Sequence, residues 1–152
     1  MGSNSIRSNI KVDNIISEIK LILGADKNKK IIILEGIDDC RLFKKFAEDD
    51  VIIKESFDSK KGVLKIKDVF KEKNNIIGIV DKDYDDVICR KGLFYYDYSS
   101  MEIMLSNSIE AFESLCSECY PEKVNIEEFR RGIFNSLKAI SLLRKYNHIN
   151  KL

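Results

Sequence analysis

The sequence has no apolar stretch near the roughly 20 residues that a membrane-spanning helix needs. Its N-terminus is polar and lacks the hydrophobic core of a signal peptide. Both absences predict a cytoplasmic protein with no membrane partner. The formal net charge is only +1, which excludes a polycation that coats nucleic acid through its overall charge.

Residues that suit zinc are also scarce. His148 is the only histidine, and Cys116 and Cys119 form a single CxxC pair. Zinc would need a second pair of ligands, which the sequence does not offer. We therefore interpret both cysteines as residues that pack a helix, and a cytosolic chain of this size needs no disulfide.

The sequence does have short apolar runs, which recur along its length of 152 residues. Four of them predict strands, at residues 30–34, 51–54, 76–80 and 93–96, and the β-branched run at residues 30–34 is typical of a strand buried on both faces. Apolar residues at helical spacing predict helices at residues 10–23, 40–48, 63–73, 100–119 and 126–146. Strands that alternate with helices predict an α/β fold with a mostly parallel four-stranded sheet, flanked by helices on both faces and followed by extra C-terminal helices.

The length favours one domain. We expect an N-terminal helix in residues 1–29, a core in residues 30–110 and a helical extension in residues 111–152. The last helix has a broad apolar face, formed by Phe129, Ile133, Phe134, Leu137, Ile140 and Leu143. This face either packs against the N-terminal helix in the core or forms a dimer or partner surface.

Two of the predicted strands end in acidic residues. Glu35 and Gly36 follow the first strand, and Asp81 and Asp83 follow the third. Ligands of parallel sheets bind at the carboxyl ends of the strands, so neighbouring strands would bring these three carboxylates together. In an extended chain residues i and i+2 point the same way, which would let Asp81 and Asp83 share one cation.

Carboxylates that lie close together repel one another unless they are protonated or a cation binds. A set of oxygen ligands without histidine or thiolate suits Mg²⁺ or Mn²⁺ rather than zinc. Mg²⁺ takes its remaining ligands from water and substrate phosphates, which predicts phosphoryl-transfer chemistry. The alternative is that the acids only cap the helices that follow, and this alternative is strongest for Asp38 and Asp39. We keep Asp39 and Asp85 as secondary site candidates.

The order of these motifs resembles the Toprim domain, which occurs in topoisomerases, bacterial primases and the nucleases of the OLD family. The motifs are LEGIDD at residues 34–39 and VDKD at residues 80–83. The segment DYSSMEIML at residues 97–105 is similar to a branch of Toprim-like proteins. That branch includes the AriB-type effectors of the PARIS anti-phage system, which work with an ABC-type ATPase. Relatives in the branch tend to be longer, so we expect this chain to be a fragment or a minimal version.

The resemblance implies roles for four acidic residues. Glu35 would be the general acid/base or a metal ligand, and Asp81 and Asp83 would be metal ligands. Similarity to the branch adds Glu102 as a further acid of the site. The implied activity is that of a Mg²⁺- or Mn²⁺-dependent nuclease that cuts DNA or RNA in anti-phage defence. The alternative is a non-catalytic Toprim module that binds nucleic acid or an ATPase partner.

Phosphate groups of the substrate would meet glycine and lysine residues. Gly36 lets the backbone turn tightly and a phosphate approach, and Lys60, Lys61 and Lys82 are candidate phosphate contacts. No glycine-rich phosphate loop is present, which favours a nucleic acid over a mononucleotide. Because the net charge is near zero, we expect weak intrinsic affinity, which a partner ATPase or a homo-oligomer joining several basic rims would raise.

Overall fold

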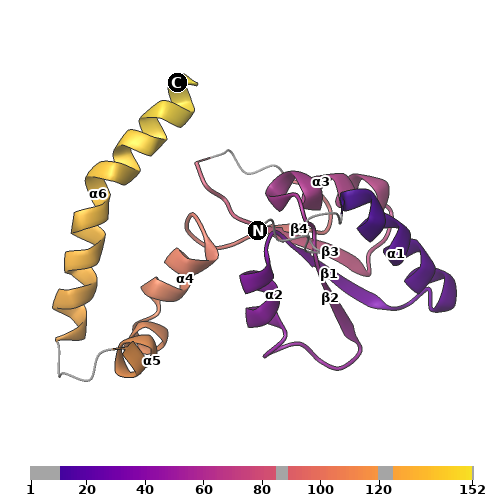
Figure 1. Ribbon diagram of the computed structural model, residues 1–152, viewed down its shortest axis with the longest axis horizontal. Coiled ribbons are helices and arrows are strands. Elements are labelled where there is room, and N and C mark those ends of the chain that lie inside the picture. The colour runs from indigo at the N-terminus through magenta and orange to yellow at the C-terminus, as the bar shows by residue number, and fades with distance from the viewer. Residues whose placement is uncertain (1–10, 85–88, 120–124, 152) are drawn as a thin grey trace, which may run out of the picture. The chain divides into compact units, whose positions relative to one another are not determined.

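The computed structural model describes residues 11–84, 89–119 and 125–151. In this part of the chain four strands form one sheet, and every strand pair in it is parallel, so the predicted α/β fold is confirmed (Figure 1). Among these described residues, no helix has the length and apolar character to cross a membrane.

Along the described residues the helices and strands alternate first and then give way to helices alone. The elements are α1 (Val12–Ala25), β1 (Lys30–Leu34), α2 (Ile37–Phe43), β2 (Val51–Glu55), α3 (Ser59–Val69), β3 (Ile76–Val80), β4 (Leu93–Tyr95), α4 (Met101–Asn107), α5 (Ile109–Cys119) and α6 (Ile126–Asn150).

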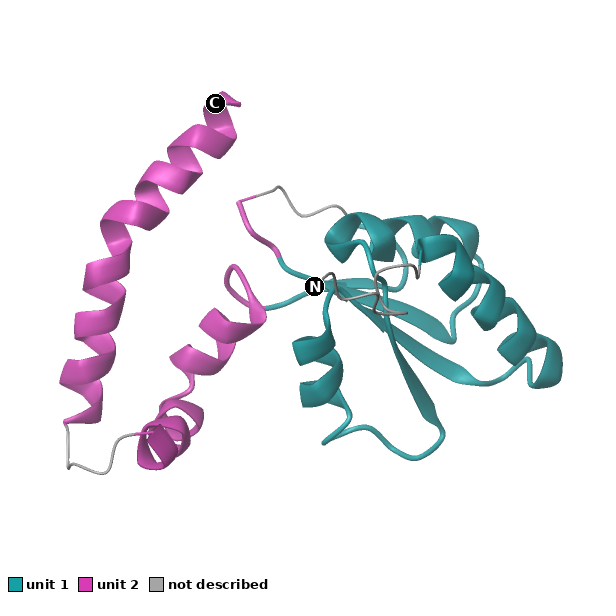
Figure 2. Cartoon of the chain, in the orientation of Figure 1, with its two compact units in different colours: residues 1–81, 87–96 teal, residues 82–86, 97–152 magenta. Residues whose placement is uncertain are grey.

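The chain forms two compact units (Figure 2). Unit 1 comprises residues 1–81 and 87–96, and unit 2 comprises residues 82–86 and 97–152. Unit 1 therefore contains the sheet with α1, α2 and α3, whereas unit 2 contains α4, α5 and α6. The boundary predicted between residues 110 and 111 falls inside α5.

The strand order in the sheet is β2-β1-β3-β4. The chain moves from β1 outward to β2 and then crosses back past β1 to β3. Right-handed crossovers in opposite directions place their helices on opposite faces, so α2 and α3 cover different faces of the sheet (Figure 1). The order of the strands thus reverses between β1 and β3.

The core of unit 1 lies between the sheet and the pair α1 and α3. In β3 the residues at positions 76, 78 and 80 are buried and alternate with less buried neighbours, as expected for one face of a strand. A Cβ atom on Gly78 would lie 2.7 Å from Cγ1 of Val63, so glycine allows α3 to pack directly onto β3. The buried apolar side chains of this core are Val12, Ile15, Ile16, Ile19, Leu23, Ile31, Ile33, Val63, Ile66, Phe70, Ile76, Val80 and Leu93.

The helix after β1 differs from the sequence prediction. It begins at Ile37 and ends at Phe43, whereas the apolar pattern placed it at residues 40–48. Oδ2 of Asp39 accepts the N–H of Gly36 at 3.1 Å, so the side chain reaches back from the first turn to the residue before the helix. This bond starts the helix three residues earlier than predicted.

The helix predicted at residues 100–119 is divided into α4 and α5. Ser108 has extended backbone geometry, with ψ of 120°, and ends α4. Its Oγ accepts the N–H of Ala111 at 3.2 Å and so caps α5. Serine competes for backbone hydrogen bonds in this way, which explains the break inside an otherwise helical pattern.

The last helix, α6, has no buried residue. Because α6 and the N-terminal helix α1 belong to different units, both readings of its apolar face stay predictions. Phe129 lies near Phe112 of α5, with ring centroids 6.2 Å apart. All four cysteines are free; Cys116 is buried in α5, but Cys119 is exposed, so its prediction as a packing residue is wrong.

Candidate functional site

The acidic motifs lie at the point where the strand order reverses. β1 and β3 are neighbours in parallel register, with Ile31 opposite Ile76 and Ile33 opposite Gly78. Both strands therefore end at the same edge of the sheet, with Glu35 directly after β1 and Asp81 directly after β3. In open α/β sheets the crevice at such a reversal is the usual position of a ligand.

A hydrogen bond joins the two acidic residues across this edge. Oε1 of Glu35 accepts the backbone N–H of Asp81, with 2.6 Å between nitrogen and oxygen. This bond fixes the direction of the Glu35 side chain. The structure thus brings together Glu35 and Asp81, as the sequence predicts.

Asp39 occupies a more central position at this edge than its secondary rank in the sequence suggests. Its Oδ2 accepts the N–H of Gly36, and its Oδ1 accepts the hydroxyl of Tyr96 at 2.7 Å. Tyr96 directly follows β4, and its backbone N–H donates to the carbonyl of Val80 at 3.2 Å. Asp39 therefore caps α2, as the alternative reading holds, and also ties α2 to the end of β4.

The hydroxyl of Tyr96 donates to Asp39 and is influenced by the charges of two further carboxylates. Burial raises the pKa of Tyr96 well above its usual range, and the hydrogen bond to Asp39 and the negative charges of Asp39, Asp81 and Glu35 raise it further. At physiological pH the hydroxyl keeps its proton and acts as a donor. The acidic edge of unit 1, by which we mean Glu35, Asp39, Asp81 and Tyr96, is thus a connected group.

Asp83 belongs to unit 2 and is not part of this group. Its predicted alignment with Asp81 depends on an extended chain, but β3 ends at Val80 and Asp83 has a positive φ of 52°. The backbone N–H of Asp83 donates to the carbonyl of Ser99 at 2.8 Å, within unit 2. The alternation argument therefore does not apply to Asp83, and its role as a ligand stays a prediction from the resemblance.

The other predicted residues of unit 2 also remain candidates. Lys82 is exposed. Glu102 lies in the first turn of α4, where its Oε2 accepts the hydroxyl of Ser100 at 2.8 Å. Asp85 lies outside the described residues.

Two of the predicted lysines lie at the carboxyl end of the sheet in unit 1. Lys60 and Lys61 are in the first turn of α3, which follows β2 at the carboxyl end of the sheet. Nζ of Lys60 lies over the ring of Tyr95, 5.9 Å from its centroid. Positive charge and the N-terminus of a helix both favour anions, so this turn suits a phosphate.

The connection between β2 and α3 is conformationally strained. Phe57 and Ser59 are non-glycine residues with φ of 60° and 45°. Ser56 between β2 and this turn is fully buried, and its Oγ donates to the carbonyl of Ser59 at 2.9 Å and approaches the carbonyl of Glu35 at 3.4 Å. Left-handed backbone at such residues costs about 1–3 kcal/mol and is concentrated at functional sites.

The acidic edge has carboxylates that could bind a divalent ion. Among the residues that the structure describes, no three or more histidine, cysteine, aspartate or glutamate side chains are placed to hold a metal ion. Mg²⁺ needs fewer protein ligands, because it is usually bound by one or two carboxylates together with water and substrate phosphates. Glu35 and Asp81 follow neighbouring strands and both carry carboxylates, so their donor chemistry fits Mg²⁺ or Mn²⁺.

Sequence reasoning missed Tyr96, which it assigned to the fourth strand. The signal was indirect. Val80 pairs with Tyr95 in parallel register, so the next residue of each strand, Asp81 and Tyr96, emerges at the same edge. Without the pairing of β3 and β4, nothing in the sequence distinguishes Tyr96 from the other tyrosines.

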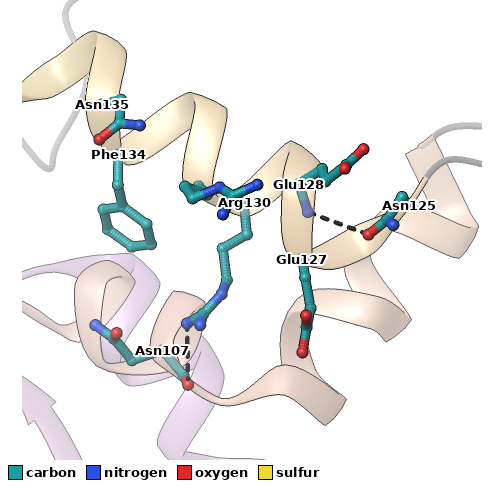
Figure 3. A pocket seen from close by; sticks show the side chains of 8 residues that line it. Asn107, Asn125, Glu127, Glu128, Arg130, Phe134 and Asn135 are labelled. Carbon is teal, nitrogen blue, oxygen red and sulfur yellow. Dashed lines mark hydrogen bonds between the residues drawn. The ribbon is translucent and has the colours of Figure 1, made fainter.

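Unit 2 contains a polar pocket of about 550 Å³ between the end of α4 and the first half of α6 (Figure 3). Arg130 points from α6 toward α4 and donates to the carbonyls of Ser106 and Asn107 at 3.4 Å each. Because an arginine in this position satisfies the last carbonyls of a helix, we interpret the pocket as a groove at a helix junction. None of the predicted site residues lines it.

No protein-family model, curated protein or solved structure matches the chain. Membership of the Toprim family therefore stays a prediction from the motifs at residues 34–39 and 80–83.

Proposed function

We propose that the acidic edge is the centre of a Mg²⁺-dependent nuclease of the Toprim type, which hydrolyses phosphodiester bonds in DNA or RNA. One observation carries the proposal. Parallel pairing of β1 and β3 places Glu35 and Asp81 side by side where the strand order reverses, joined by the 2.6 Å hydrogen bond.

The proposed mechanism assigns metal binding and proton transfer to named residues. Glu35 and Asp81 of unit 1 would hold the ion, and the resemblance alone implies Asp83 and Glu102 as further ligands. When bound, Mg²⁺ supplies activation of water and neutralisation of phosphate charge. Glu35, whose direction is fixed by the N–H of Asp81, would accept a proton from the attacking water.

Lysines at the same edge would position the substrate backbone. Lys60, Lys61 and the first turn of α3 favour a phosphate, and Gly36 lets it approach β1. Lys82 is a further proposed contact. With a net charge of +1 the affinity for nucleic acid should be low and should fall steeply with salt, so an ABC-type ATPase or a second copy of the chain would strengthen binding. The role in anti-phage defence rests on the segment at residues 97–105.

A cleavage assay tests the proposal directly. Single- and double-stranded DNA, tRNA and other RNA are incubated with the protein and Mn²⁺ at low salt. Glu35→Gln should lower the rate by about a hundredfold to ten-thousandfold, the usual contribution of a general base. Asp38→Asn is the matched control, because Asp38 is exposed and pairs with Arg41 on the surface. Equal rates in Glu35→Gln and the unmodified protein would show a different active site or a contaminating nuclease.

Metal binding is measured separately by calorimetry. Asp81→Asn removes one carboxylate charge and should weaken Mn²⁺ binding sharply while leaving the fold intact. An Mn²⁺ affinity that does not change in this variant would place the ion elsewhere.

The second candidate is a non-catalytic module that binds nucleic acid or an ATPase partner. The observation in its favour is the apolar surface of α6, where Leu137, Ile140, Leu143 and Tyr146 are exposed. Exposed apolar side chains in such number are typical of a partner surface. Mn²⁺ binding without cleavage of any substrate would favour this candidate.

A further inference from the structure

We infer that Tyr96 is a positioning residue of the acidic edge, because its hydroxyl holds Asp39, and Asp39 holds the turn from which Glu35 projects. The effect on metal binding rests on the proposed function, whereas the effect on the turn rests on hydrogen-bond geometry alone.

Tyr96 is fixed at three points. Its backbone N–H donates to the carbonyl of Val80, which continues the pairing of β3 and β4 beyond the last strand residue. Its ring lies near that of Phe43 in α2, with centroids 6.3 Å apart, and its side chain is 5% exposed. Its hydroxyl donates to Oδ1 of Asp39 at 2.7 Å. The hydroxyl therefore has little freedom to move and can determine where Asp39 lies.

Asp39 transmits this restraint to the peptide group that follows Glu35. The N–H of Gly36, which donates to Oδ2 of Asp39 at 3.1 Å, belongs to the peptide bond between Glu35 and Gly36. The carbonyl of the same peptide group lies 3.4 Å from Oγ of Ser56, which is fully buried. The peptide plane is thus held at both ends, and its orientation sets the direction in which the Glu35 side chain leaves the backbone.

The restrained peptide aims Glu35 at its partner. From this position Oε1 of Glu35 reaches the N–H of Asp81 at 2.6 Å. The chain of contacts therefore runs from Tyr96 through Asp39 and Gly36 to Glu35 and Asp81, and it links β4, α2, β1 and β3. Every member lies in unit 1.

A tyrosine suits this role because it remains a donor beside negative charges. Burial, the hydrogen bond to Asp39 and the nearby carboxylates raise the pKa of Tyr96, so the hydroxyl stays protonated. Phenylalanine would keep the ring against Phe43 but would leave Oδ1 of Asp39 without its donor. Tyr96→Phe is therefore a clean removal of the hydrogen bond.

The first measurement is amide hydrogen exchange by NMR in Tyr96→Phe. If Tyr96 only stabilised the fold, exchange would accelerate most at amides that open by global unfolding, including that of Ile66 in the core. The positioning role instead predicts that exchange at the amides of Gly36 and Asp81 accelerates by about tenfold more than exchange at the Ile66 amide. Tyr146→Phe, at an exposed tyrosine of α6, is the control and should leave all three amides unchanged.

The second measurement is Mn²⁺ affinity in a double-mutant cycle. Tyr96→Phe should weaken binding about tenfold, the lower end of the effect of outer partners on metal sites. Because the hydroxyl acts through Asp39, Tyr96→Phe should add less than about twofold in an Asp39→Asn background. Additive effects of the two substitutions would overturn the inference.

The two measurements separate this inference from the proposed function. An unmodified protein that binds no Mn²⁺ contradicts the proposed function, and the exchange data then decide on Tyr96 alone. Unchanged exchange at Gly36 and Asp81 in Tyr96→Phe overturns the inference whether or not the metal binds.

Discussion

Unit 1 and unit 2 are both rich in apolar residues but use them differently. Unit 1 buries its apolar side chains between a parallel sheet and two helices, and Ile19, Ile33 and Ile66 have no exposed surface. In unit 2 the buried apolar residues among those described are Met101, Phe112 and Cys116, and α6 buries none. The apolar runs with strand character therefore predicted both the strands and their burial. The apolar stripe of α6 predicted the helix but not what its apolar face packs against.

The same contrast applies to polar groups. At the acidic edge of unit 1, carboxylates accept hydrogen bonds from Asp81, Gly36 and Tyr96 on three different elements. In unit 2 several groups around the polar pocket lie at helix termini, as Asn125 does when it caps the start of α6 by accepting the N–H of Glu128. Convergence of acids from distant parts of the chain, rather than the presence of a pocket, therefore directs the functional proposal to unit 1.

Truncation of a core side chain should show the largest difference between the units. Ile66→Ala leaves a cavity in the core of unit 1 and should lower the free energy of unfolding by about 2–5 kcal/mol. Leu143→Ala removes a side chain that is 61% exposed on α6 and should change it by less than about 0.5 kcal/mol. Urea unfolding of both variants measures the difference. Equal losses would mean that α6 is packed more tightly than its exposure indicates.

Replacing a glycine by alanine in each unit tests how much space surrounds the backbone there. Gly78→Ala brings a Cβ within 2.7 Å of Val63, which is fully buried and cannot move away, so we expect a loss of about 1–3 kcal/mol. Gly132→Ala in α6 meets nothing within 4 Å and should stabilise the helix by up to about 1 kcal/mol. The opposite signs are measured as shifts in the thermal midpoint. A neutral Gly78→Ala would show that α3 can move away from β3.

Two adjacent aspartates compare a bridging carboxylate with a surface one. Asp39→Ala removes the acceptor of the Gly36 N–H and the Tyr96 hydroxyl, which should cost about 1–3 kcal/mol. Asp38 is exposed and pairs with Arg41 at 2.8 Å, so Asp38→Ala should cost less than about 1 kcal/mol. Chemical denaturation of both variants gives the comparison. Equal costs would remove the structural argument for a connected acidic edge.

The sequence could predict features that depend on local patterns, but not the specific contacts between residues that are far apart in the chain. The β1 and β3 runs were recognisable because they are short, apolar and followed by acids, and helices between strands imply parallel neighbours. Those two facts suffice to place Glu35 beside Asp81. The bond between Tyr96 and Asp39 spans 57 residues and depends on the exact start of α2, which the apolar pattern placed three residues late. The position of Asp83 depends on the backbone conformation after β3. An apolar pattern does not predict a turn that begins with an aspartate at positive φ.

The smallest expected effect is a pH dependence that belongs to unit 1 alone. Lys67 of α3 is buried, and its Nζ donates to the carbonyl of Ile76 at 2.6 Å. Burial, followed by the charge of Lys91, lowers the pKa of Lys67 from its ordinary value of 10.5. As the pH rises toward that value, the folded protein releases this proton before the unfolded chain does. The unfolded chain then binds more protons, so the free energy of unfolding rises with pH across this interval.

Lys67→Met keeps the buried volume but removes the titrating group. The stability of the unmodified protein relative to Lys67→Met should therefore increase from neutral pH up to about pH 10.5 and level off above it. Lys65→Met, at an exposed lysine of the same helix, controls for the loss of one positive charge. Urea unfolding at a series of pH values gives the two curves. If the curves for the unmodified protein and Lys67→Met run parallel, the ammonium of Lys67 is not desolvated. Lys67 would then be less buried between α3 and β3 than the structure indicates.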